Sequence, residues 1–169
     1  MLKHEPILKI STLNNLFTEF NKNISHKKLK NLNKILEAYS GNDWKNYKND
    51  EFEKNKYNKK TVIENDILQL CIFTWNKHTE SDIHDHSPNG CLIKKLEGIL
   101  HENIYLNQYD KILFIKQNEL VSEKVSYNES DIILHKIISK DEISTSIHIY
   151  VKDDKFNKKI YYCDNANDL

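Results

Sequence analysis

The second half of the chain is a series of short stretches in which apolar and polar residues alternate, and no helical pattern interrupts them. The clearest stretch lies at 68–75, and further strands are predicted near 91–97, 99–106, 111–117, 120–127, 131–138, 143–151 and 157–163. The links between them are short and rich in Asn, Asp, Glu and Ser. Many short strands at this spacing predict an antiparallel β-sandwich or β-barrel.

The first part of the chain differs, because its apolar residues recur at helical spacing. The first predicted helix covers residues 11–22, with Ser11 or Thr12 as its N-cap. The second covers residues 26–40 and ends at Gly41. A third, shorter helix is expected before the first strand.

The two patterns divide the chain without separating it into two domains. We expect about 1–50 to form a helical N-terminal cap and about 58–163 to form the β-barrel, within a single domain of residues 1–169. That length is sufficient for one hydrophobic core. No internal repeat or low-complexity linker marks a boundary.

The charge balance and the cysteine content limit the kinds of binding partner and the cellular compartment that we expect. The 25 basic residues, all of them lysines, balance 25 acidic residues, so the chain has no electrostatic preference for nucleic acid or an anionic membrane. The spacing of Cys71, Cys91 and Cys163 does not suggest a disulfide framework, and a reducing, cytoplasmic setting is expected. The sequence begins without the apolar core of a signal peptide, and no apolar run approaches membrane-spanning length.

Three histidines are the candidates for a metal site. His84 and His86 are two residues apart, so on a strand their imidazoles point to the same side, as two ligands of a transition metal do. His135 lies in the apolar stretch 132–138, where a buried imidazole needs a partner. A metal ion and an ordinary hydrogen bond in the core satisfy that need equally well at this point.

A file of polar side chains occupies one face of the predicted strand 143–151. Ser146, His148 and Tyr150 are spaced by two and share that face, while isoleucines occupy the other. Such a file fits the lining of a pocket, where the three groups relay hydrogen bonds. It fits equally well the exposed face of an antiparallel strand.

Together these motifs give the chain a recognisable pattern, which resembles the thiol dioxygenases of the cupin superfamily and most closely type I cysteine dioxygenase. The similarity is carried by Leu36 to Tyr39, Trp44, Tyr47, Ile83 to His86, Cys91, Leu96 to Gly98, Leu134-His135 and Ser146 to Tyr150. In cupins the first motif is His-x-His, four residues, Glu, six residues and Gly. Here His84, His86 and Gly98 keep that frame, and Cys91 stands at the Glu position, as in cysteine dioxygenases.

The resemblance implies a fold and a reaction. The fold is mainly β, a small cupin barrel of the jelly-roll type with a helical N-terminal segment. His84, His86 and His135 are expected to bind Fe(II), and the enzyme is expected to add both atoms of O2 to the sulfur of L-cysteine, giving cysteine sulfinic acid. We expect a monomer.

The resemblance also implies roles around the iron. Tyr150 would place its hydroxyl over the metal, with His148 bonded to that hydroxyl and Ser146 orienting His148. Cys91 would form a thioether cross-link with Tyr150.

Tyr57 and Lys59 would bind the substrate carboxylate, and Lys59 stands where the family has an arginine. Because lysine lacks the two-pronged guanidinium, two alternatives stay open. One is a dioxygenase for another small thiol, 3-mercaptopropionate or cysteamine. The other is a metal-binding cupin without catalytic activity.

Overall fold

A computed structural model describes residues 9–109 and 111–163. The helices are α1 (Leu13–Asn23), α2 (Asn33–Glu37) and the short 3₁₀ helix η1 (Asp43–Tyr47). The strands are β1 (Asn58–Glu64), β2 (Leu68–Trp75), β3 (Ile83–Glu97), β4 (Leu100–Gln108), β5 (Lys111–Glu119), β6 (Ser126–Ser139), β7 (Ser144–Val151) and β8 (Ile160–Tyr161). The first eight residues of the predicted N-terminal cap lie outside the described part.

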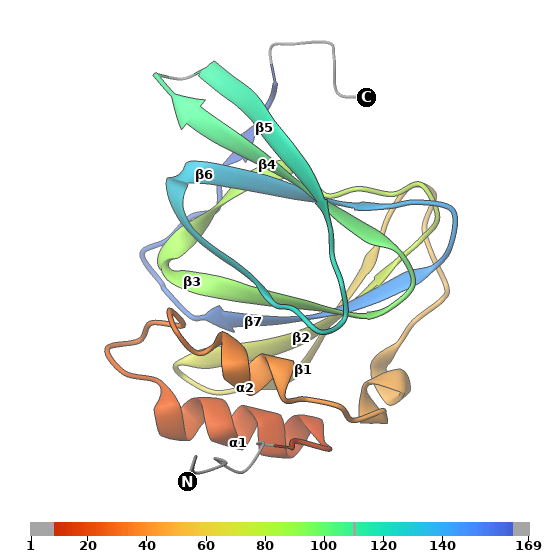
Figure 1. The fold of residues 1–169 in the computed structure, drawn as a ribbon, viewed down its shortest axis with the longest axis vertical. Coiled ribbons are helices and arrows are strands. Elements are labelled where there is room, and N and C mark those ends of the chain that lie inside the picture. The colour runs from red at the N-terminus through yellow and green to blue at the C-terminus, as the bar shows by residue number, and fades with distance from the viewer. Residues whose placement is uncertain (1–8, 110, 164–169) are drawn as a thin grey trace, which may run out of the picture.

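Among the described residues, all strands belong to one sheet in the order β1-β2-β7-β3-β6-β4-β5, with β8 paired to β3, and every pairing is antiparallel. Figure 1 shows the sheet curling over, so that β6 and β4 lie opposite β3, β7 and β2. The helices lie against the outside of the β2 and β7 layer (Figure 1). No helix in the described ranges has the length and apolar character needed to cross a membrane.

The alternation along β2 and β7 decides which side chains face the interior of the barrel. The odd-numbered apolar residues of β7, such as Ile147 and Ile149, pack together with Leu70 of β2 and with buried residues of α1 and α2. The intervening residues therefore point to the opposite side, into the curled sheet. The helical segment thus seals one face of the layer and leaves the other face free to line a pocket.

A buried lysine ties the helical segment to the sheet. Lys94 of β3 is 6% exposed, and its Nζ donates to the backbone carbonyls of Leu36, Glu37 and Tyr39 at 3.2, 2.9 and 2.6 Å. These carbonyls belong to the end of α2 and the residues after it, where helical carbonyls lack partners. The ammonium group therefore provides hydrogen-bond donors for the free carbonyls at the end of α2 and holds this end against β3.

The helix predicted over 26–40 is wrong in its first half, since α2 covers only Asn33–Glu37. His26, Lys27 and Asn31 have positive φ values of 51°, 53° and 70°, which are incompatible with a continuing helix. Leu29 is fully buried, and its backbone N–H donates to the carbonyl of Asn89 at 2.9 Å. This tertiary contact outweighs the helical periodicity.

The strand predicted over 120–127 is also wrong, because β5 ends at Glu119 and a turn precedes β6. Leu120 is buried in the barrel interior, which accounts for the apolar signal without a strand. The strand predicted at 131–138 is part of the longer β6, and the one predicted at 157–163 shrinks to β8.

Candidate metal centre

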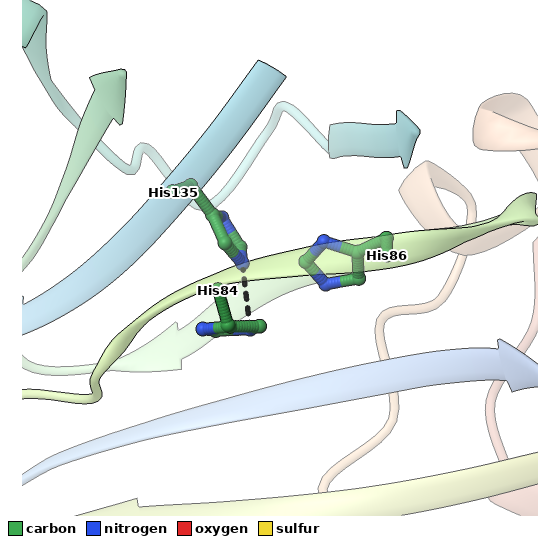
Figure 2. Close-up of side chains that lie close together, drawn as sticks. All are labelled: His84, His86 and His135. Atoms are coloured by element: carbon green, nitrogen blue, oxygen red, sulfur yellow. Dashed lines mark hydrogen bonds between the residues drawn. The ribbon is translucent and has the colours of Figure 1, made fainter. Parts of the chain in front are cut away.

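Three imidazoles converge inside the curled sheet (Figure 2). His84 and His86 come from β3, and His135 comes from β6, where it is the register partner of His84. The ring centroids are 4.6 to 4.9 Å apart, and one nitrogen from each ring lies within 4.8 Å of the others. The register shift between His84 and His86 marks an irregularity of the kind that often re-aims side chains beside active sites.

Hydrogen bonds assign the protons of two of these rings. Nδ1 of His84 donates to the carbonyl of Asp82 at 2.8 Å, and Nδ1 of His135 donates to a carboxylate oxygen of Glu102 at 2.6 Å. Nε2 of His84 then carries a lone pair and lies 3.2 Å from Nε2 of His135, the contact that the dashed line in Figure 2 marks. In the tautomer with its proton only on Nδ1, His135 likewise presents a lone pair. Two facing lone pairs repel unless a cation lies between them.

Burial keeps the rings of His84 and His86 neutral. Burial, with His135 nearby, lowers the pKa of His84 to about 3 and the pKa of His86 well below its usual range. Nδ1 of His86 is buried and has no hydrogen-bond partner within the described ranges. Neutral imidazoles with free nitrogen lone pairs are suitable ligands for a divalent transition metal, so the residues present fit a metal ion.

The polar file of β7 faces the interior, so the exposed-face alternative is wrong. Ser146 and His148 are 0% and 3% exposed. Oγ of Ser146 is 2.9 Å from Nε2 of His148, and Nδ1 of His148 is 3.0 Å from the hydroxyl of Tyr150. The indole N–H of Trp75 donates to Oγ of Ser146 at 2.9 Å, which extends the file by one residue.

These bonds have a consistent direction. The indole of Trp75 only donates, so Ser146 accepts from it. In the Nδ1–H tautomer of His148, the Ser146 hydroxyl donates to Nε2 of His148. Nδ1–H of His148 then donates to the phenol oxygen of Tyr150, leaving the phenol proton free to point elsewhere. Burial raises the pKa of Tyr150 well above its usual range, so this proton stays on the phenol.

A cavity of about 450 Å³ joins the imidazoles to the other predicted residues. Its lining includes all three histidines of the cluster together with Tyr57, Lys59, His148 and Tyr150. Nζ of Lys59 lies 5.3 Å from the centre of the Tyr150 ring and 3.5 Å from Oε1 of Gln69. The ammonium of Lys59 therefore stands beside the phenol of Tyr150 at the wall of the cavity.

Cys91 is fully buried and does not line the cavity. It is the direct register partner of Tyr150 in the pairing of β3 with β7. Burial raises the pKa of its thiol well above the usual range, and the sulfur is not part of a disulfide. The structure thus brings together every residue predicted for the site.

Two contributors were missed by sequence reasoning. The first is Glu102, which forms a hydrogen bond with His135. In the sequence, Glu102 lies two residues after Leu100 and so on the same face of the strand, where alternation predicts an apolar residue. Trp75 was interpreted as the end of a strand. The hydrogen bond from its indole to Ser146 depends on the pairing of β2 with β7, which the sequence does not specify.

Comparison with known proteins agrees with the geometry. The family model for cysteine dioxygenase type I matches residues 3–156. Cysteine dioxygenase type 1 of Rattus norvegicus is 30% identical over 129 residues, and that of Homo sapiens is 33% identical over 129 residues. Each match covers 69% of this chain and 61% of the relative, so the chain spans less than two thirds of their length.

Solved structures bear on the fold alone, since their sequences are distant. Peruvianin-I, a cysteine peptidase from Thevetia peruviana latex, has 11% identity and a TM-score of 0.51, covering 68% of this chain and 72% of its own. A cupin superfamily protein from Desulfitobacterium hafniense has 17% identity and a TM-score of 0.46, covering 61% and 84%.

The predicted fold class, a cupin-type barrel with a helical N-terminal segment, is confirmed by the strand architecture and the family match. The motif of His84 and His86 with Cys91 at its expected place lies within the matched region. The chain belongs to the cysteine dioxygenase type I family.

Proposed function

We propose that this protein is an Fe(II)-dependent dioxygenase that converts L-cysteine and O2 into cysteine sulfinic acid. The observation that carries the proposal is the cluster of three imidazoles, with two Nε2 atoms facing each other, in a cavity that also holds Lys59 and Tyr150. Family membership supports the same reaction. Iron bound by the imidazoles would supply Lewis acidity and the one-electron chemistry that lets a thiolate react with dioxygen.

The overall reaction needs no other reactant. A thiol and one O2 contain all the atoms of a sulfinic acid, and the four electrons that sulfur loses are those that the two oxygen atoms accept. The cavity that holds all three histidines is lined by imidazoles, aromatic rings and two lysines. A site for a separate reductant is therefore not required.

Lys59 would hold the substrate by its carboxylate. Its ammonium lies at the wall of the cavity, 3.5 Å from the amide oxygen of Gln69 and near the rings of Phe73 and Tyr150, so an anion in the cavity can reach it. An ammonium provides charge but not the paired hydrogen bonds of a guanidinium. Lys59 therefore orients the carboxylate less strictly than an arginine.

Tyr150 would act through its free phenol proton. Because His148 donates to the phenol oxygen, the phenol can donate a hydrogen bond into the cavity, where the reacting sulfur and oxygen atoms would lie. The aromatic rings of Tyr57, Phe73 and Trp75 pack against one another along the same wall. They reduce the access of water to the reacting atoms.

A second candidate function is oxidation of another small thiol, 3-mercaptopropionate or cysteamine. Lys59 favours this alternative, because a single exposed cation discriminates weakly between carboxylates. A metal-binding cupin without turnover is the third possibility. The three differ in which thiols support oxygen consumption.

The test is iron-dependent oxygen uptake by the purified protein with cysteine, 3-mercaptopropionate and cysteamine. We expect uptake with cysteine, with the highest kcat/KM of the three, and none after iron is removed by a chelator. Faster oxidation of 3-mercaptopropionate or cysteamine would identify that thiol, rather than cysteine, as the substrate. No uptake with any of them by the iron-loaded protein would contradict an enzymatic function.

A further inference from the structure

Glu102 is a charged residue enclosed in the barrel. It lies on β4 and is 3% exposed. Its carboxylate accepts from Nδ1 of His135 at 2.6 Å, from Oγ of Ser126 at 2.7 and 2.9 Å, and from Nδ2 of Asn128 at 3.0 Å. All three donors come from β6, so one carboxylate fixes two parts of that strand.

A buried carboxylate is costly unless it is fully paired. The carboxylate of Glu102 accepts hydrogen bonds from His135, Ser126 and Asn128, and these donors favour its charged form. Glu102 is thus a carboxylate anion in contact with an imidazole of the cluster. A non-polar residue would fill the same place without needing three donors, which indicates that the charge has a role.

His84 offers a comparison within the same cluster. Nδ1 of His84 donates to a neutral backbone carbonyl, whereas Nδ1 of His135 donates to an anion at a shorter distance. Charge-assisted hydrogen bonds are shorter and about twice as strong as neutral ones. Of these two imidazoles, His135 is held in one tautomer more firmly, and its Nε2 is the more electron-rich.

We propose that Glu102 is a positioning residue that fixes His135 as the third metal ligand and places one negative charge beside the three imidazoles. The inference rests on the proposed metal site and deepens it. Glu102 locks the proton on Nδ1, so that Nε2 keeps its lone pair towards His84. Its charge stabilises a divalent cation that the imidazoles themselves leave uncompensated.

The first test measures metal affinity. The dissociation constants of Fe(II) and Co(II) are determined by competition with a chromophoric chelator for the parent protein, Glu102→Gln, Glu102→Asp and the control Glu119→Gln. Glu119 is exposed on β5, so its amide tests the same chemical change outside the site. We expect Glu102→Gln to weaken binding by about tenfold to a hundredfold, Glu102→Asp to restore part of it, and Glu119→Gln to match the parent.

A second measurement needs no variant at Glu102. Nitrogen NMR of the metal-free parent, with His135→Asn to assign the signals, reports which ring nitrogen carries the proton. We expect His135 to hold its proton on Nδ1 with Nε2 bare. A proton on Nε2 would overturn the inference even if Glu102→Gln failed to fold.

The outcomes separate this inference from the proposed function. If the parent binds metal, His135→Ala loses it and folded Glu102→Gln binds as tightly as the parent, the role of Glu102 is wrong and the metal site stands. If the parent does not bind metal, or His135→Ala retains full affinity, the proposed metal site itself is wrong.

Discussion

Cys91 of β3 and Tyr150 of β7 are direct partners across an antiparallel pairing, and both side chains face the interior of the barrel. Side chains in such a pair have Cβ atoms about 4.5 to 5.5 Å apart. The sulfur is therefore within reach of the phenol ring after a small rotation.

We predict a thioether bond between Cys91 and Tyr150 in protein that has turned over. The new bond replaces one S–H and one ring C–H bond, and O2 accepts the two electrons and two protons released. Intact-mass spectrometry should show a population lighter by two hydrogen atoms, absent in Cys91→Ser and retained in Cys163→Ser. A single unmodified mass after many turnovers would exclude the cross-link.

Each histidine of the cluster should be required for metal. We expect about one iron per chain in protein expressed with iron, and its loss in His84→Ala, His86→Ala and His135→Ala, because three imidazoles share the ion. His78→Ala is the matched control, since His78 is exposed on a turn. Metal analysis of the purified variants tests this. Full iron retention in His135→Ala would show that His135 is not a metal ligand.

Lys59 should control affinity for the carboxylate. Lys59→Arg adds a second parallel hydrogen bond, worth about 1.5–3 kcal/mol, and should lower the KM for cysteine by about tenfold to a hundredfold with little change in kcat. Lys59→Ala should raise that KM steeply but leave cysteamine, which lacks a carboxylate, unaffected. Steady-state kinetics with both thiols tests this. Unchanged cysteine kinetics in Lys59→Ala would mean that the carboxylate is held elsewhere.

Lys94 should contribute to stability rather than to chemistry. Lys94→Met keeps the apolar stem but leaves three buried carbonyls of the α2 end without their donor. The free energy of unfolding should fall by about 2–3 kcal/mol. Urea denaturation tests this, with Lys95→Met, on the opposite face of β3, as the control expected to change little. Equal stability of the two variants would show that the ammonium is dispensable.

Local pattern was sufficient for much of the fold. Alternation predicted β2 and β7 because each face of these strands has one consistent environment. It failed at 26–31, where positive φ values at His26 and Lys27 accompany a contact between Leu29 and Asn89 of β3. Such contacts depend on tertiary packing that a local pattern does not encode.

The residues of the site were also only partly predictable from the local sequence. The pair His84 and His86 was visible from its spacing, whereas His135 was assigned to it only through the family resemblance, and the pairing of β3 with β6 brings it beside them. Glu102 was not predicted at all, because a single Glu in a strand gives no indication of its partner. Pairing across strands, rather than local spacing, completes this centre.

The central claim is that both atoms of one O2 molecule are transferred to the sulfur of cysteine. The most direct measurement is turnover of cysteine under ¹⁸O2 in ordinary water, followed by mass spectrometry of the product. We predict cysteine sulfinic acid in which both sulfinyl oxygens carry the label. Product with one labelled oxygen or none, or disulfide in place of sulfinate, would contradict the dioxygenase account.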